Sequence, residues 1–214
     1  MKILICAGHT LEGKGTGAVG YLNESQENRV LSKIIVKYLS QAGHNVDYYE
    51  INKSDNYLSD QVTTANSKKY DLVVQVHFNA YKNTNDEMGT ETLYISDKGK
   101  VYSEKINAKL STIFKSRGAK RNQQLYWLRN TNPVSVLIET CFIDSKSDIE
   151  KYKANKDKVG KLIAEAIHGN SIEEEKIFYR VVAGSYTNKN LAEAQAKLLE
   201  DKGIKGVFLD IYKK

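Results

Sequence analysis

The chain has 214 residues but only two cysteines and one proline. Two cysteines cannot form the disulfide framework of a small secreted domain, and Cys6 and Cys141 both lie in strand-like sequence, where small core residues are common. No apolar run approaches the roughly 18 residues of a membrane-spanning helix, so no membrane insertion is expected. The N-terminal apolar run is shorter than the roughly 7–15 residues of a signal-peptide core. We therefore expect a protein made in the cytoplasm without a signal peptide.

Charge of one sign is only mildly in excess. The chain carries 32 Lys and Arg against 26 Asp and Glu, a net charge of +6. Such an excess favours the approach to any polyanion, including an anionic cell wall. No segment is dense in Lys and Arg, so no nucleic-acid partner is expected.

Strand-like and helix-like segments alternate over most of the chain. Strands are predicted at 2–7, 46–51, 71–78, 90–96 and 135–142, and helices at 24–41, 56–68, 101–118 (with a stop at Gly118) and from the last strand to about 168. The central strands are continuous apolar runs, typical of strands covered on both faces. The alternation predicts an α/β fold, a doubly wound and mostly parallel twisted sheet with helices on both faces.

The pattern changes after residue 168. Residues 169–176 are predicted to be a linker, and 177–214 to form a small β-α-β module of strand, helix and strand. Domains below about 40 residues rarely bury enough apolar surface to fold alone. We therefore expect this module to pack against something else.

Polar side chains gather where the strands end. His9 follows the first strand, His77 and Asn79 end the third, and Glu139 interrupts the apolar strand 135–142. Glu24 lies in the first turn of the predicted helix 24–41, on its core-facing stripe. In open α/β sheets, ligands bind beyond the carboxyl ends of the strands. These side chains are therefore expected to form one site.

The residue types favour a metal centre. Two histidines and one carboxylate with an open fourth position are a common catalytic zinc set, and zinc lowers the pKa of its bound water to about 7. His9, Glu24 and His77 would supply this set, and Glu139 would act as the general base and acid.

Each residue also has a structural explanation. A single histidine at a strand end is more often a hydrogen-bonded polar residue than a ligand, and Glu24 would also favour the dipole of its helix. Glu139 is harder to explain in this way, because a carboxylate in an apolar strand is costly unless it is paired or functional. Spacing alone leaves both interpretations open.

Five segments together resemble the zinc-dependent N-acetylmuramoyl-L-alanine amidases of the amidase-3 family. They are "AGHT", "NES", "ANSKKYDLVVQVHFNA", "GTETLYIS" and "LRNTNPVSVLIETCFID", in this order within residues 1–168. The resemblance implies that 1–168 is an amidase catalytic domain, that His9, Glu24 and His77 bind Zn²⁺, and that Glu139 is the catalytic carboxylate. It also implies that the partner is bacterial peptidoglycan and that the amide between N-acetylmuramic acid and L-alanine is hydrolysed.

Two positions depart from the family pattern. Cys6 stands where the family often has Asp, and Gln61 where it often has Arg. Neither position is a proposed ligand, so the departures concern substrate contacts and the surroundings of the site. Asn79 is predicted to position the substrate or the loop. Tyr126 and Trp127 are predicted to line the groove, with core packing as the alternative for these two aromatic residues.

The tail is similar to the start of a SPOR domain, a peptidoglycan-binding module. The likeness rests on "VAGSY", an Ala-rich helix and "KGI". A SPOR domain has two such halves, so we hypothesise that 177–214 binds peptidoglycan, dimerises, or does both; the alternative is that it packs on its own amidase domain.

The cellular role follows from the expected route. A lytic enzyme without a signal peptide acts on the cell wall after the membrane is breached, as a phage endolysin or as a mother-cell lysis amidase of a spore former. The endolysin is favoured because the tail is short. The rival functions are a non-catalytic peptidoglycan-binding protein on the same fold and a zinc peptidase that cuts within the stem peptide.

Overall fold

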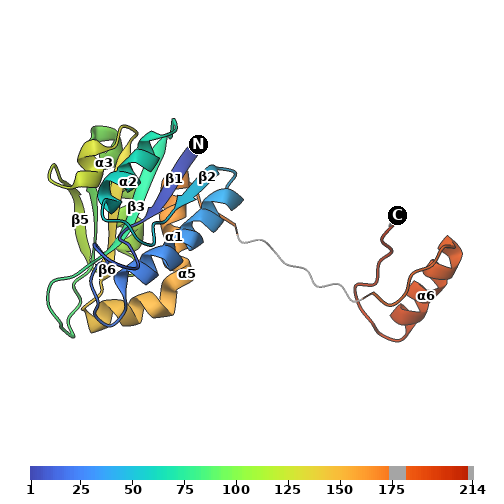
Figure 1. Cartoon of the computed structure of the whole chain (residues 1–214). Helices are drawn as coiled ribbons and strands as arrows, with labels where there is room; N and C mark the ends of the chain where they lie inside the picture. Colours follow the sequence, from blue (N-terminus) through green and yellow to red (C-terminus); the bar gives the residue numbers. More distant parts are fainter. Residues whose placement is uncertain (174–181, 212–214) are drawn as a thin grey trace. The chain divides into compact units, whose positions relative to one another are not determined.

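A computed structural model describes residues 1–173 and 182–211 of the chain (Figure 1). The chain divides into two compact units, Met1–Glu173 and Glu174–Lys214. Ile172 is buried in the core of the first unit, and its amide N–H donates to Glu165 Oε1 at 3.3 Å. The first unit therefore extends into the segment 169–176 that was expected to be a linker.

The first unit is built around a six-stranded sheet with the strand order β2-β1-β3-β6-β4-β5. The strands are β1 (Lys2–Ala7), β2 (Asn45–Tyr49), β3 (Leu72–Asn79), β4 (Thr90–Tyr94), β5 (Ser116–Arg121) and β6 (Ser135–Phe142). Only the pair of β4 and β6 is antiparallel, and the other neighbours are parallel. The predicted α/β fold with a mostly parallel sheet is confirmed.

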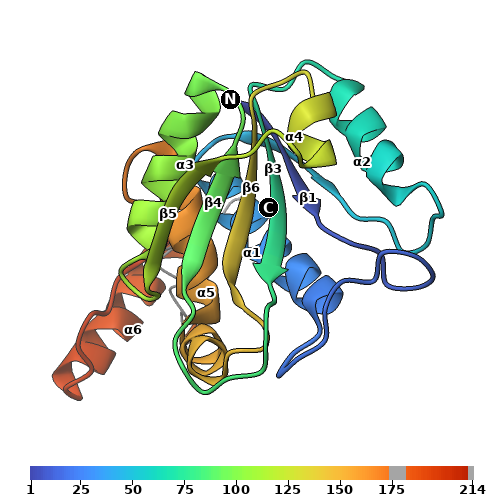
Figure 2. The same cartoon turned by 90° about the vertical axis from the view of Figure 1, so that its left-hand side faces the viewer.

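Helices lie on both faces of this sheet (Figures 1 and 2). They are α1 (Glu24–Gln41), α2 (Tyr57–Asn66), α3 (Asp97–Leu110), α4 (Tyr126–Asn130) and α5 (Lys146–His168). The larger core lies under α1, α3 and α5, and a smaller core lies under α2 and α4. In Figure 2, α2 and α4 lie over the upper part of the near face, and no helix of the first unit lies over the lower parts of β4, β5 and β6.

The start of α1 is fixed by its cap. The side chain of Asn23 accepts a hydrogen bond from the Gln26 amide, which satisfies one of the free N–H groups at the helix start. The helix has the bounds that the sequence predicted. Its first residue is therefore Glu24, which lies at the positive end of the helix dipole.

The helix predicted over 101–118 is wrong in both bounds. The side chain of Ser96 caps α3 and accepts from the Gly99 amide at 3.1 Å, so the helix begins at Asp97, and it ends at Leu110. Gly118 is no helix stop. It lies in the edge strand β5 with a φ of 87°. Three of its six residues are charged and four are exposed, so its sequence carries no apolar alternation to indicate it.

The second unit contains α6 (Lys189–Asp201), none of whose residues is buried. Most of the first strand predicted for the tail falls on 174–181, outside the described residues. The predicted second strand is wrong, because 204–211 form no strand. A lone strand has no ladder partner, which explains its absence in a single copy. No described helix is long and apolar enough to span a membrane.

Candidate metal centre and active site

His9 lies just beyond β1 and is the only non-glycine residue with a positive φ, 64°, in the described part of the chain. Its Nδ1 donates to the carbonyl oxygen of Gly15 at 2.9 Å. This bond fixes the ring so that Nε2 lies 3.1 Å from Glu24 Oε1. The loop after β1 therefore leaves one nitrogen of His9 available as a ligand.

His77 lies near the carboxyl end of β3 and approaches the same carboxylate. Its Nδ1 lies 3.1 Å from Glu24 Oε1, and its ring centroid lies 4.7 Å from that of His9. The ring packs directly on the backbone at Gly8, where an added Cβ would lie 2.3 Å from the imidazole. Position 8 therefore requires glycine if His77 is to keep this orientation.

Glu24 is the buried centre of the cluster. Its Oε2 accepts from the Ala18 amide at 2.9 Å, and its Oε1 accepts from the Phe78 amide at 3.2 Å. Burial would raise the pKa of Glu24, but the hydrogen bonds from His77 and His9 outweigh it and hold the pKa well below the ordinary value. Glu24 is therefore ionised.

The two histidines differ in their titration. Burial would lower the pKa of His9, but the hydrogen bond to Glu24 and its charge raise the pKa above the ordinary value. For His77, burial dominates and lowers the pKa, and Glu24 offsets only part of this effect. His77 is therefore neutral near pH 7, which is the state a metal ligand needs.

A metal ion could be held by a group of three or more His, Cys, Asp or Glu side chains whose potential ligand atoms all lie within 4.8 Å of one another. In the described residues, His9, Glu24 and His77 form the only such group. Bonds of about 2.0–2.1 Å to a tetrahedral zinc ion separate its ligand atoms by about 3.3 Å. The two distances of 3.1 Å to Glu24 Oε1 are close to this spacing. The donor types and their separation therefore fit zinc.

Glu139 lies beside the cluster, because it pairs with His77 in the register of β3 and β6. It is half-buried, and its Oε2 is buried without a hydrogen-bond partner. Burial, followed by the negative charges of Glu24 and Glu91, raises the pKa of Glu139 well above the ordinary value. An unpaired carboxyl with a raised pKa next to a ligand cluster is suited to proton transfer.

Asn79 is tied to a residue that sequence reasoning missed. Its Nδ2 donates to Glu91 Oε1 at 3.0 Å. Glu91 is 8% exposed and also accepts from Arg117 and Lys120 on β5. The signal was present, because Glu91 interrupts an apolar strand in "TETLYIS" as Glu139 does in "SVLIETCF".

The two aromatic residues predicted to line the groove lie on α4, near the amino end of β6. Trp127 is 2% exposed, belongs to the smaller core and donates from Nε1 to the Val136 carbonyl at 3.2 Å. Trp127 is therefore a core residue, as the alternative prediction had it, and it does not line the groove. Tyr126 is exposed on the same short helix. The structure therefore separates both residues from the histidine cluster.

Cys6 and Gln61, the two departures from the family pattern, lie under the site. Gln61 is buried, donates to the Ala7 carbonyl at 3.1 Å and accepts from Gln75 Nε2 at 2.9 Å. Cys6 is buried beside them, and burial raises the pKa of its thiol to about 12. Neutral side chains therefore support the end of β1, and none of them reaches the metal ligands.

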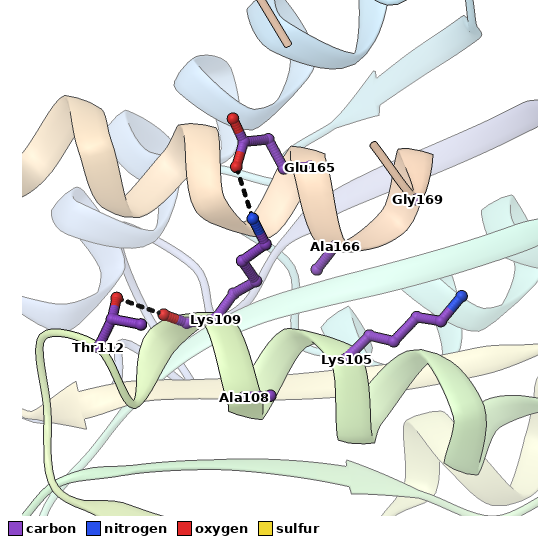
Figure 3. A pocket seen from close by; sticks show the side chains of 7 residues that line it. All are labelled: Lys105, Ala108, Lys109, Thr112, Glu165, Ala166 and Gly169. Carbon is purple, nitrogen blue, oxygen red and sulfur yellow. Dashed lines mark hydrogen bonds and ion pairs between the residues drawn. The ribbon is translucent and has the colours of Figure 1, made fainter. Parts of the chain in front are cut away.

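A groove of about 360 Å³ lies elsewhere, between α3 and α5 (Figure 3). An ion pair of 2.9 Å between Lys109 and Glu165 crosses it. The groove is lined by Lys105, Ala108, Lys109, Thr112, Glu165, Ala166 and Gly169. None of these residues belongs to the histidine cluster. The candidate active site is therefore the cluster at the strand ends.

Comparison with known families gives one match that covers most of the chain. Residues 3–169 match the Amidase_3 family, described as N-acetylmuramoyl-L-alanine amidase. The matched range contains the three clustered side chains His9, Glu24 and His77 as well as Glu139, and it ends before the second unit.

Individual relatives agree with this match. The solved catalytic domain of the CD27L endolysin, which targets Clostridia difficile, superimposes with a TM-score of 0.75 and 36% identity over 81% of this chain and 99% of that domain. An uncharacterised protein of Clostridium perfringens is 39% identical over 81% of this chain and 53% of its own length. This chain thus spans about half the length of that relative.

A third relative extends over the second unit. A sporulation-specific N-acetylmuramoyl-L-alanine amidase of Bacillus subtilis is 28% identical over 98% of this chain and 84% of its own length. The similarity to this protein therefore includes the tail.

Proposed function

The chain belongs to the Amidase_3 family of N-acetylmuramoyl-L-alanine amidases, and we propose that it is a zinc-dependent hydrolase of the amide between N-acetylmuramic acid and L-alanine in bacterial peptidoglycan. The convergence of His9, Glu24 and His77 beside Glu139 carries the proposal. Two imidazoles, one carboxylate and a neighbouring free carboxyl are the parts that metal-assisted amide hydrolysis needs.

His9, Glu24 and His77 would hold the zinc ion. When bound, zinc supplies Lewis-acid chemistry, lowering the pKa of a bound water to about 7 and polarising a carbonyl group. The chain fixes the ligands before binding, because Gly15 O orients His9 and the Ala18 amide orients Glu24. Little reorganisation is then needed, which favours tight binding.

Glu139 would transfer the proton. Its carboxylate accepts a proton from the attacking water as the new carbon–oxygen bond forms. The same carboxyl then donates this proton to the amine of L-alanine as the carbon–nitrogen bond breaks, so protons and charge balance. No hydrogen-bond partner competes for its Oε2. Asn79, held by Glu91, would position the substrate at the edge of this site.

The proposed cellular role is that of a phage endolysin, made in the cytoplasm and acting on the wall after the membrane is breached. Its similarity to an endolysin catalytic domain over nearly the whole of that domain supports this role. A mother-cell lysis amidase is the second candidate, favoured by the similarity to a sporulation-specific amidase over 98% of the chain.

The tail is proposed to bind peptidoglycan, to dimerise, or to do both. Its helix α6 buries none of its residues, and Leu191 and Leu198 are exposed on it. Sedimentation at tens of micromolar would test dimerisation by comparing the full chain with residues 1–173. A full chain that sediments as a monomer contradicts the dimer. Equal wall binding by both proteins contradicts a wall-binding tail.

The reaction is tested by an end-group assay on purified peptidoglycan with the zinc-loaded full chain. We expect new N-terminal L-alanine without new reducing sugars, and loss of this release on addition of a chelator. Glu139→Gln should lower the rate by about 10²–10⁴-fold, the usual contribution of a general acid–base group, while zinc content stays at one ion per chain.

Other products would decide between the rivals. New termini other than L-alanine would replace the proposed bond with one inside the stem peptide. Binding to the wall without new termini, even with added zinc, would leave a non-catalytic binding protein. Unchanged turnover in Glu139→Gln would remove Glu139 from the mechanism.

A further inference from the structure

Strand β5 turns two cations toward the active-site face of the sheet. In its register with β4, Thr90 pairs with Ser116 and Thr92 with Ala119, so Glu91 alone faces both Arg117 and Gly118. This is a β-bulge, and Gly118 has the positive φ of 87° that such an extra residue often adopts. The bulge lets Arg117 and Lys120 reach the same carboxylate, although regular alternation would turn them to opposite faces.

Glu91 holds these two cations. Its Oε2 accepts from Arg117 Nε at 3.0 Å and from Lys120 Nζ, and its Oε1 accepts from Asn79 Nδ2 at 3.0 Å. Burial would raise the pKa of Glu91, but the two cations outweigh it and lower the pKa. One ionised carboxylate between two cations leaves one positive charge in excess.

Both cations remain accessible. The side chain of Arg117 is 34% exposed and that of Lys120 is 47% exposed, whereas that of Glu91 is 11% exposed. Arg117 also lies over the ring of Phe142, with Cζ 4.9 Å from the ring centroid. This contact and the bond to Glu91 restrict the guanidinium while part of it still faces solvent. An oriented and accessible guanidinium is a good carboxylate receptor.

The cations lie at a defined distance from the proposed chemistry. Glu91 pairs with Glu139 in the register of β4 and β6, and Glu139 pairs with His77. Neighbouring strands lie about 4.8 Å apart, so β5 lies about 10 Å across the sheet from β6. An extended peptide covers this distance in about three residues. No helix of the first unit lies over this part of the sheet in Figure 2.

We propose that Arg117 and Lys120 form a subsite for a carboxylate of the peptidoglycan stem peptide, two or three residues beyond the scissile amide. The inference rests on the proposed function, and it takes the carbonyl of that amide to lie between Glu139 and the proposed metal ligands. The stem peptide then runs across β4 toward β5, and an acidic group at its second residue meets the surplus positive charge. Glu91 positions the two cations and keeps them on the active-site face of the sheet.

The test measures binding, so that it does not depend on turnover. The probes are two muramoyl tripeptides with the sequence L-Ala-D-isoglutamate-L-Lys or L-Ala-D-isoglutamine-L-Lys, which differ by one carboxylate. Calorimetry with the zinc-loaded full-length Glu139→Gln protein should give about tenfold tighter binding of the acid than of the amide. In the same background, Arg117→Gln with Lys120→Gln should reduce this ratio to about one.

Arg121→Gln is the matched control, because Arg121 lies on the same strand, is exposed, and is outside the Glu91 cluster. It removes one positive charge from the same strand and should keep the tenfold ratio. The ratio compares the affinities of two ligands for the same protein sample. Partial unfolding of the double variant would lower both apparent affinities equally and leave their ratio unchanged. Arg117→Lys, which keeps the charge, should retain a reduced preference.

Two results would overturn the subsite: equal affinity of the parent protein for both tripeptides, or a preference that survives the double substitution. A third result would separate the subsite from the proposed reaction. This result is tighter binding of the acid than of the amide, together with no hydrolysis of either tripeptide by the zinc-loaded chain with Glu139 intact. It leaves the carboxylate subsite in place and rejects the proposed reaction.

Discussion

At the scale of single residues, two glycines are as important to the site as its ligands. The ring of His77 occupies the space that a Cβ at Gly8 would need, and a Cβ at Gly17 would lie 2.8 Å from Glu24 Oε2 and 2.9 Å from His9. The side chains of the cluster thus pack against the backbone at two glycines, where no Cβ would fit. We therefore expect that even an added methyl group at these glycines would disturb the proposed metal site.

Gly8→Ala is therefore expected to abolish stoichiometric zinc binding. The new methyl group would lie 2.3 Å from the imidazole of His77 and force the ring away from Glu24. Metal content after dialysis against limiting zinc measures the effect, with about a tenfold or greater loss of affinity expected for a displaced ligand.

Gly43→Ala is the matched control for this substitution. Gly43 has a φ of 81°, and no atom lies within 4 Å of its added Cβ. It should lower the free energy of unfolding by about 1 kcal/mol through backbone strain and leave zinc content unchanged. Full zinc occupancy in Gly8→Ala would contradict the close packing of His77 on the backbone.

The second residue-scale prediction concerns the stability cost of Glu139. Burial raises the pKa of its carboxyl well above the ordinary value. In the pH window between the ordinary pKa and this raised pKa, the folded protein retains a proton that the unfolded chain has released. The free energy of unfolding must then fall with rising pH across the same window. Glu139→Gln removes this loss and should stabilise the metal-free protein at pH 7.

Thermal unfolding in the presence of a chelator checks the sign. The midpoint of Glu139→Gln should exceed that of the parent at pH 7, and the difference should shrink toward pH 4.5. A difference that grows as the pH falls would mean that the carboxylate form is stabilised in the fold.

At the scale of elements, the junction between β6 and α5 joins the carboxyl end of a central strand to the helix layer. The side chain of Ser145 caps α5 by accepting from the Asp148 amide. The buried carboxylate of Asp148 accepts from the amides of Met88, Gly89 and Phe142 at 3.2, 2.8 and 3.1 Å. One side chain thus joins the loop before β4, the end of β6 and the start of α5.

Asp148→Ala is expected to lower the free energy of unfolding by about 3 kcal/mol, because it leaves three backbone donors without a partner and each buried unsatisfied donor costs about 1–3 kcal/mol. Denaturant titration measures the loss. Glu150→Ala, on the exposed side of the same helix, should change stability by less than about 0.5 kcal/mol. Equal effects of the two substitutions would contradict the bracing role of Asp148.

The elements differ in how well their sequence predicts them. The bounds of α1 follow from Asn23 and a regular apolar stripe, which are local features. β5 follows from neither, because an exposed edge strand with a bulge has no alternation and depends on β4 for its hydrogen bonds. The helix predicted through 118 was wrong for this reason.

At the scale of the whole molecule, the proposed zinc site links parts of the chain that are far apart in sequence. His9 follows β1, Glu24 starts α1, and His77 lies near the carboxyl end of β3. These three side chains are close together only in the folded state, so zinc would bind the folded protein and hardly the unfolded chain. The proposed metal binding would therefore be coupled to folding.

Added zinc should raise the free energy of unfolding by about 2.7 kcal/mol when its free concentration is 100 times the dissociation constant. Calorimetric unfolding with zinc and with chelator measures the shift. His77→Ala should abolish it, whereas His44→Ala, a histidine outside the cluster, should not. An equal shift in His77→Ala would place the stabilising zinc elsewhere.

The sequence by itself determined the α/β alternation, the bounds of α1 and the candidates His9, Glu24, His77 and Glu139. These depend on local patterns, on strand ends and on the order of motifs. Only the tertiary structure decided that the two histidines His9 and His77 converge on Glu24 Oε1, that Trp127 belongs to the core, and that a bulge turns Arg117 toward Glu91. The physical reason is that strand pairing and register join residues distant in the chain, and local sequence does not specify which strands become neighbours.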